Sequence, residues 1–440
     1  MNFLFIVTFC VAIPPISKEE ENMDNISSIK NDFLSRSQEL VQSPLTEELV
    51  ALERQVSFIL NGMERGFKVD VAALTDLKNS YDGKLSALQK GTEENLGRGI
   101  RSDSNRDLAE LLFGQLALPS LKKTQAQSNS VSITVLERLK ESHGRLNPFL
   151  NPLVEYKRLQ PISKAIKTIF KKLDADNRIH PEFNQSGCPT GRIYSYIQNL
   201  PREVRKVLIP EKEENLFIDI DWSQQELRIL AALSAEPVLL DCIAKGEDLH
   251  KRVISEMFHK PVSEVTDDER KLGKTINFGL IYGQEAPGLA WNLNISLEKA
   301  QQLIDQYFSA LPLIKRFKEE SEAKFWKTGY AETAFGRKTL LNIRSGNIDR
   351  ELRRGFNHQI QGTGADLLRF TLVRMSEGLE GKPARLKFCA HDSIYIEAPK
   401  EASHEMGEFA KSIMELDFKG VPLPVTVKIH PDFSMGQGNP

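Results

Sequence analysis

A single switch in the spacing of apolar residues constrains this fold more than any other feature of the sequence. Residues 217–221 read Phe-Ile-Asp-Ile-Asp, the alternation of a half-buried strand. Residues 225–234 then return to helical spacing, and helical patterns fill most of the chain on either side. A hairpin is expected over 386–398, with His391 and Asp392 at its tip. The pattern predicts an α+β fold in which a small sheet carries carboxylates and a helical block is inserted between its strands.

Helical periodicity defines the rest of the organisation, and no internal repeat of fixed period interrupts it. A chain of 440 residues exceeds what one hydrophobic core usually supports, so several subdomains are expected. The expected helices cover 45–63, 71–90, 107–116, 134–140, 153–173, 249–258, 267–281, 296–323 with a break at Pro312, and 350–377 with close packing or a bend at Gly362 and Gly364.

Composition describes an ordinary globular protein, with 40% hydrophobic and 27% charged residues and a net charge of −2. The four cysteines, Cys10, Cys188, Cys242 and Cys389, form no CxxC pair, which argues against a disulfide framework or a cysteine zinc site. Residues 157–210 nevertheless hold 11 basic and four acidic side chains. This stretch could bind a polyanion or could simply be a solvated basic face.

The N-terminus begins with a short apolar run over residues 3–13, too short to span a bilayer. It lacks a basic region and a small-residue cleavage site, so we interpret it as a signal-peptide mimic or an upstream start, with Met23 as an alternative initiator. Residues 1–40 are expected to be a poorly ordered leader. We expect a cytoplasmic, nucleoid-associated protein with no membrane segment, and an organelle or phage context stays open.

Two aspartates are the first candidates for chemistry. Asp221 ends the strand at 217–221, and Asp392 sits at the hairpin tip. Carboxylates on adjacent strands can hold two divalent cations roughly 3.5–4 Å apart, as phosphoryl transfer requires. An aspartate at a hairpin tip is also a common turn former, so spacing alone leaves both interpretations open.

A second candidate is one face of the helix expected at 267–281. Arg270, Lys274 and Phe278 advance by four residues and therefore lie along one side. The face offers two cations for a triphosphate and an aromatic plate for a base. An exposed basic face with Phe278 as a core contact is the alternative.

Together these segments resemble the family A DNA polymerases. DWSQQELRILAALS (221–234), RKLGKTINFGLIYG (270–283) and AHDSIYIEAP (390–399) are similar to the three polymerase motifs of that family. The resemblance covers residues 45–440 in the family's order. Further matches are ILNGMERGFKVD (59–70), DLAELLFGQLALP (107–119), TGRIYS (190–195), EDLH (247–250), AFGRK (334–338) and RRGFNHQIQGTGAD (353–366).

The resemblance implies a right-hand architecture: a palm with a small antiparallel sheet, and helical fingers and thumb. Its partners would be primer–template DNA and dNTPs, and its cofactor two Mg²⁺ ions, or Mn²⁺ in their place. The implied boundaries are 41–165 for the thumb with a preceding palm-side helix, 166–233 for the first part of the palm, 234–342 for the fingers and 343–440 for the second part of the palm.

The resemblance also implies roles for single residues. Asp221, Asp392 and the backbone carbonyl of Trp222 match the metal ligands, and Asp219, the nearest competitor, lies outside the motif. Arg270 and Lys274 would hold the triphosphate, and Lys274 would give a proton to pyrophosphate. The other matched nucleotide residues are His250 near the β-phosphate, Phe278 stacking on the nucleotide, Tyr282 at the template slot and Glu226 as a steric gate against ribose. The matched DNA-binding residues are Arg192, Gln198, Asn357, Gln361 and Arg353.

Three features depart from the family's pattern. Ser393 stands where the family usually has Glu, the loop from Arg192 to Gln198 is shorter than usual, and the segment HPDFSMGQGNP (430–440) lacks the family's common aromatic pattern. The leading hypothesis is a DNA-directed DNA polymerase without its own proofreading exonuclease, since only about 40 residues precede the thumb region. A separate proofreading or processivity factor could then be a partner. Two alternatives stay open: a relative specialised for RNA templates or ribonucleotides, and a degenerate, non-catalytic DNA-binding protein motivated by Ser393.

Overall fold

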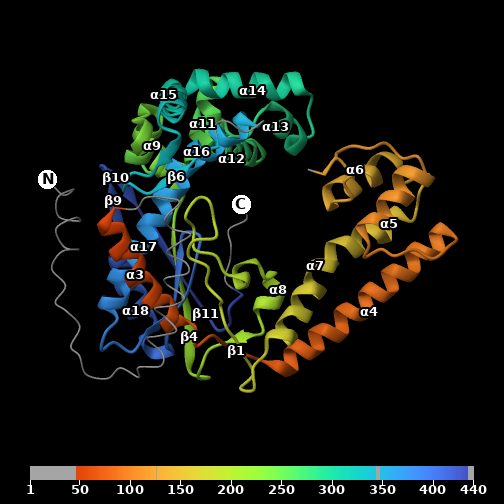
Figure 1. Cartoon of the computed structure of the whole chain (residues 1–440), viewed down its shortest axis with the longest axis horizontal. Coiled ribbons are helices and arrows are strands. Elements are labelled where there is room, and N and C mark those ends of the chain that lie inside the picture. Colours follow the sequence, from red (N-terminus) through yellow and green to blue (C-terminus); the bar gives the residue numbers. More distant parts are fainter. Residues whose placement is uncertain (1–45, 125, 343–346, 435–440) are drawn as a thin grey trace. The chain divides into compact units, whose positions relative to one another are not determined.

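Figure 1 shows the computed structural model, which describes residues 46–124, 126–342 and 347–434. The leader predicted at 1–40 lies outside the described residues. Two compact units are present, and the chain passes between them several times. Of the described residues, the first unit takes in 46–65, 182–195, 218–342 and 347–429, and the second takes in 66–124, 126–181, 196–217 and 430–434.

The main sheet of the first unit has four strands in the order β11-β4-β8-β7. Strands β7 and β8 pair antiparallel with Ala390 opposite Ser393, so a two-residue loop, His391 and Asp392, joins them. His391 takes a left-handed φ of 56°, as a residue in such a tight hairpin loop often must. The strands are β4 (Asn215–Trp222), β7 (Arg385–Ala390), β8 (Ser393–Pro399) and β11 (Val425–His430).

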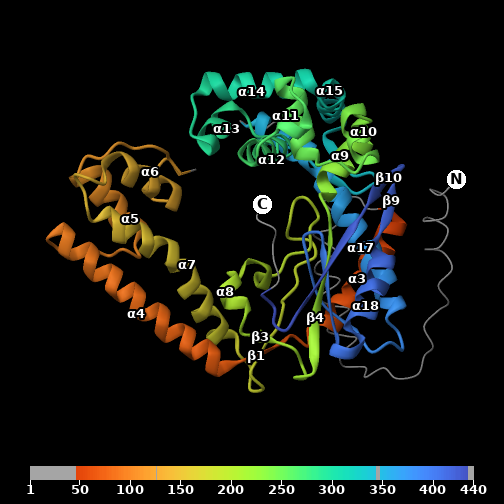
Figure 2. The ribbon, with the colours of Figure 1, turned by 180° about the vertical axis from the view of Figure 1, so that it is seen from behind.

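Three helices cover this sheet, α3 (Glu47–Met63), α17 (Thr363–Gly378) and α18 (Ser403–Met414), and they lie together in both views (Figures 1 and 2). Most of the buried side chains on these helices are apolar, such as Val56 and Leu372, both fully buried. The buried indole of Trp222 donates from Nε1 to the Met414 carbonyl at 2.9 Å. This bond ties the end of β4, next to Asp221, to the helical layer.

The helical block between β4 and the hairpin follows the predicted periodicity closely. Helices over 225–234, 249–258 and 267–281 are confirmed with those bounds, and the predicted break at Pro312 separates α14 from α15. The elements are α9 (Gln225–Ser234), α10 (Pro237–Ala244), α11 (Leu249–Phe258), α12 (Asp267–Ile281), α13 (Ala286–Leu293), α14 (Leu297–Ala310), α15 (Pro312–Thr328), β5 (Tyr330–Glu332) and β6 (Lys338–Leu340).

The helix predicted over 350–377 is confirmed as one continuous helical segment over 348–378, with a π-helical turn inside it. It consists of α16 (Ile348–Asn357), a π-helical turn (His358–Gly362) and α17. The predicted close packing is confirmed, because a Cβ on Gly364 would lie 2.6 Å from Oε1 of Gln225 on α9. A π turn inserts an extra residue and so re-aims the side chains around it, which a regular 3.6-residue pattern does not reveal.

The second unit is helical around a small sheet of order β2-β1-β3. The helix predicted to end near residue 90 continues to Leu96, and Gly97 with φ 73° ends it. Gly91 did not stop it, because helix interiors tolerate glycine at modest cost. The elements are β1 (Phe67–Val69), α4 (Val71–Leu96), α5 (Asn105–Ala109), a π-helical turn (Glu110–Gln115), α6 (Ile133–His143), α7 (Leu150–Lys172), β2 (Arg178–Ile179), a 3₁₀ turn (Tyr196–Asn199), α8 (Arg202–Arg205) and β3 (Leu208–Ile209).

Several short elements were not predicted at all, including α18, β9 (Leu416–Phe418), β10 (Val421–Leu423) and β11. Within the described ranges, no helix has both the length and the apolar content needed to cross a bilayer.

Candidate active site

The two aspartates lie where three strands of the main sheet end. The backbone N–H of Trp222 donates to the Asp392 carbonyl at 3.3 Å, which joins the end of β4 to the hairpin tip. Ser393 Oγ donates to Asp221 Oδ1 at 2.5 Å. From β11, Thr426 Oγ1 donates to the Asp221 carbonyl at 3.4 Å. Residues about 170 positions apart in sequence therefore share one site.

Burial makes this site electrostatically unfavourable for two bare carboxylates. The pKa of Asp392 is raised to about 8, because burial disfavours its charged form and the Asp221 carboxylate adds repulsion. Burial also raises the pKa of Asp221, although the Ser393 hydrogen bond and the charge of Lys428 oppose that rise. A divalent cation between such carboxylates would relieve both penalties.

The donor set fits a hard cation such as Mg²⁺. Carboxylate and carbonyl oxygens are its preferred ligands, and it keeps several waters, so two protein carboxylates suffice. Among the residues that the structure describes, no group of three or more His, Cys, Asp or Glu side chains could form a richer metal site. The Asp221–Asp392 pair, with the neighbouring Trp222 backbone, is thus the candidate metal site.

Helix α12 carries the predicted triphosphate face. The helix begins at Asp267, and its N-cap residue Thr266 forms a capping box with Glu269. Arg270 Nε donates to Asp248 Oδ2 at 2.8 Å, and Lys274 Nζ lies 5.9 Å from the centre of the Phe278 ring. Both cations therefore sit on the same side as Phe278, one held by a carboxylate and one over an aromatic face.

His250 is buried behind this face at 3% exposure. Its Nδ1 lies 3.1 Å from Asn277 Nδ2, and its ring centre is 5.8 Å from that of Phe278. Burial lowers the pKa of His250 to about 4, and the nearby Arg270 and Lys274 charges act in the same direction. Gly273 allows α11 and α12 to come this close, because a Cβ there would lie 2.6 Å from the His250 carbonyl oxygen.

A second cluster joins Arg192, Glu226, Tyr282 and Gln361. Arg192 Nη2 forms an ion pair with Glu226 Oε1, and the Glu226 side chain is almost fully buried. The Tyr282 hydroxyl lies near Glu226 and Gln361, and both side chains act on its pKa. Burial raises the pKa of Tyr282 and the Glu226 charge adds to the rise, so the phenol stays protonated. Four residues from four separate segments thus share one polar centre.

Three predicted site residues remain, Arg353, Asn357 and Gln198. Arg353 pairs with Glu285, and its Cγ would be 2.6 Å from a Cβ on Gly283, whose φ is 69°. Asn357 is the last residue of α16. Gln198 lies in the 3₁₀ turn of the second unit and is buried.

Comparison with known proteins decides the family. The family model described as DNA polymerase family A matches residues 71–435. The chain belongs to DNA polymerase family A. A solved family A structure, the POL domain of Pol1 from M. smegmatis in complex with DNA primer–template and dNTP, matches with a TM-score of 0.82 and 28% identity, over 88% of this chain and 72% of that one. The predicted α+β polymerase fold is confirmed by this match.

Curated family A relatives give the same result. The thermostable DNA polymerase I of Thermus aquaticus is 33% identical over 400 residues, which cover 87% of this chain and 48% of the relative. DNA polymerase I of Bacillus subtilis is 31% identical over 417 residues, which cover 91% and 46%. The chain spans about half the length of the curated relatives it matches.

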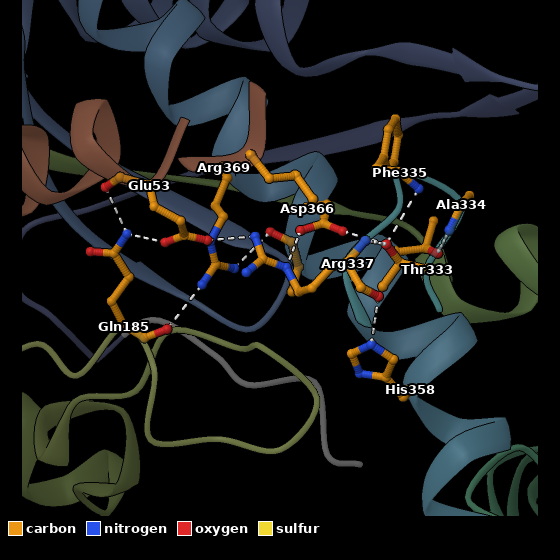
Figure 3. A network of polar contacts seen from close by, with 12 residues as sticks. Glu53, Gln185, Thr333, Ala334, Phe335, Arg337, His358, Asp366 and Arg369 are labelled. Atoms are coloured by element: carbon orange, nitrogen blue, oxygen red, sulfur yellow. Dashed lines mark hydrogen bonds and ion pairs between the residues drawn. The ribbon is translucent and has the colours of Figure 1, made fainter. Parts of the chain in front are cut away.

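One polar feature of this family A domain was not predicted from the sequence, a buried chain of ion pairs (Figure 3). Arg369 pairs with Glu53, Glu53 with Arg337, and Arg337 with Asp366. Arg337 and Asp366 lie in matched segments, AFGRK and the end of RRGFNHQIQGTGAD, but no local spacing pairs them. The detectable signal was Glu53, a carboxylate on the apolar stripe of its helix, where an unpaired charge is costly.

Proposed function

We propose that this family A chain is a DNA-directed DNA polymerase that adds dNTPs to a primer 3′-hydroxyl by two-metal-ion phosphoryl transfer. The observation that carries the proposal is the meeting of Asp221 and Asp392 at the strand ends, in the unit that also holds α12. The solved relative that held a primer–template and a dNTP supports the choice of substrates.

Asp221 and Asp392, with the Trp222 carbonyl, would hold two Mg²⁺ ions. When bound, these ions lower the pKa of the attacking hydroxyl and neutralise charge on the transferring phosphate. The chain's own contribution is to keep two carboxylates close in a buried place, with Ser393 fixing one oxygen of Asp221. The two carboxylates that would hold the metal ions are therefore already in place before any substrate binds.

Helix α12 would bind the triphosphate. Arg270 and Lys274 supply positive charge, and Lys274 would donate a proton to the leaving pyrophosphate. Phe278 would stack on the nucleotide, while the neutral His250 could donate a hydrogen bond to a phosphate oxygen. Asp248, which holds Arg270 at 2.8 Å, would keep the guanidinium aimed until a phosphate competes for it.

The polar centre would test the sugar and the new base pair. Glu226 would crowd the position of a ribose 2′-hydroxyl, and Tyr282 would guard the template slot. Arg192, Gln361, Asn357 and, from the second unit, Gln198 would contact minor-groove acceptors that all base pairs share. Arg353 would join them on the template side.

The basic stretch 157–210 would neutralise duplex phosphates, which predicts salt-sensitive binding. In this proposal, 41–165 acts as the thumb with a preceding palm-side helix, 234–342 as the fingers, and 166–233 with 343–440 as the palm.

Primer extension tests the proposal directly. Purified chain is supplied with a DNA primer on a DNA or an RNA template, with dNTPs or rNTPs, and with Mg²⁺, Mn²⁺ or a chelator. We expect extension with dNTPs and either metal on DNA and none with the chelator. Binding of primer–template without extension under every condition would support the non-catalytic DNA-binding alternative, and extension with rNTPs would support the ribonucleotide one.

A further inference from the structure

The turn that carries Arg192 rests on a buried set of charges that the mechanism above does not use. We call Glu53, Arg337, Asp366 and Arg369 the ionic ladder (Figure 3). We propose that the ionic ladder is a positioning device for Arg192, and through it for Glu226. The inference rests on the proposed polymerase function for its kinetic consequence.

The ionic ladder is continuous and almost completely shielded from water. Arg369 Nε lies 2.8 Å from Glu53 Oε1, the same oxygen lies 2.5 Å from Arg337 Nη2, and Arg337 Nε lies 2.6 Å from Asp366 Oδ1. No side chain of the four is more than 8% exposed. Two positive and two negative charges thus balance in the interior, joining α3, α17 and the β5–β6 loop.

Part of the ladder holds the segment 182–195. Arg369 Nη2 donates to the Gln185 carbonyl at 3.0 Å, and Gln185 Nε2 donates to the Glu53 carbonyl at 2.9 Å. Asn184 and Tyr194 exchange backbone hydrogen bonds of 2.7 and 2.8 Å, which close the segment into a loop. Holding Gln185 on one limb therefore also restrains the limb that carries Arg192.

The side chain of Arg337 packs against the turn at Gly191. Gly191 has φ 78°, and a Cβ there would lie 3.0 Å from Arg337 Cδ, so the turn's backbone packs on the arginine side chain. The next residue, Arg192, forms the ion pair with buried Glu226. A shift of Arg337 would therefore move the residue that orients Glu226.

Stability alone is a poor reason for this arrangement. Burying charges costs solvation free energy that the pairing often only balances, and well-packed apolar residues would stabilise the fold as well. Apolar residues could not donate a hydrogen bond to the Gln185 carbonyl, as Arg369 does. We infer that the ionic ladder instead fixes the position of the turn that carries Gly191 and Arg192.

A double-mutant cycle tests the proposal on the full chain. Because Arg369→Met alone would leave Glu53 partly unpaired, the charge-balanced variant Arg369→Met with Glu53→Gln is measured as well. Each is combined with Arg192→Ala, and single-turnover dNTP incorporation is followed. We expect a loss of about 10- to 100-fold with Arg192 present, the scale of a small misplacement, and a further loss below about threefold in the Arg192→Ala background.

A matched control separates positioning from stability. Leu372 is a fully buried apolar residue on α17, the helix that carries Arg369. Leu372→Ala should lower the midpoint temperature of unfolding, but at temperatures below that midpoint its dNTP incorporation rate should equal that of wild type. Equal losses in both Arg192 backgrounds, or no loss with Arg192 present, would overturn the inference.

A second measurement does not depend on activity. Backbone hydrogen exchange of residues 187–195 should be faster in both ladder variants and unchanged in Leu372→Ala. If wild type fails to extend primers but exchange responds this way, the proposed function fails while the positioning survives. Unchanged exchange in the ladder variants would refute the positioning itself.

Discussion

Ser393 donates a 2.5 Å hydrogen bond to Oδ1 of Asp221. The residue that departs from the family's usual Glu is therefore in direct contact with a candidate metal ligand. The bond lowers the pKa of Asp221 against the effect of burial, so it favours the charged carboxylate that a cation needs.

The Mg²⁺ concentration needed for activity should show how Ser393 affects the candidate metal site. We expect wild type to be active but to need more Mg²⁺ than a Ser393→Glu variant, whose added carboxylate strengthens the site. Ser393→Ala should need the most, because Asp221 loses the bond that favours its charge; outer partners of this kind typically change affinity or activity by about 10- to 100-fold. Mg²⁺ titrations of the initial extension rate check the order, and a Ser393→Glu variant with equal or higher demand would contradict it.

The aspartate pair should be essential for chemistry and dispensable for DNA binding. Asp221→Asn or Asp392→Asn should abolish nucleotide addition, whereas primer–template affinity, which depends on many phosphate contacts, should change by less than about threefold. Single-turnover extension and fluorescence anisotropy measure the two properties. Asp305→Asn, an exposed position on α14, is the control. An Asp221 or Asp392 variant that extends near the wild-type rate would rule out the metal assignment.

Glu226 should exclude ribonucleotides by its size. Glu226→Ala should raise the ratio of rNTP to dNTP incorporation, whereas Glu226→Gln, which keeps the size but loses the charge, should keep the ratio low. Both variants break the ion pair with Arg192, so any effect they share reports that pair and any difference reports the steric gate. A ratio that changes equally in both variants would argue against a steric role.

The free energy of unfolding should decrease as the pH is lowered, because the pKa of His250 is lower in the folded protein than in the unfolded chain. Its pKa is about 4 in the folded protein and about 6.5 in the unfolded chain, so the unfolded chain binds more protons between these values. The free energy of unfolding should therefore fall as pH drops from about 6.5 to 4, by at most about 3 kcal/mol. Denaturant unfolding of wild type and His250→Gln at several pH values checks this, and the variant should show a shallower slope. Parallel pH profiles would contradict the assignment.

Local sequence was sufficient for the elements whose signals are local. The helices at 225–234, 249–258 and 267–281 were predicted with their observed bounds, because a helix is defined by apolar spacing and by caps such as the Thr266–Glu269 box. The hairpin was predicted because two short strands flank only two residues. The π turn at His358–Gly362 and the extension of α4 to Leu96 were not predicted, since neither changes the apolar pattern clearly.

The sequence by itself determined the family and most helices, and it predicted Asp221 and Asp392 as candidate metal ligands. Tertiary structure alone decided which side chains meet: Ser393 with Asp221, Arg192 with Glu226 and Tyr282, and Arg369 with Glu53 from 316 positions away. Such contacts depend on strand order and helix packing, and they join residues too far apart for any periodic pattern to encode. Residue type and spacing can suggest a charge's role, but only the folded chain supplies its partner.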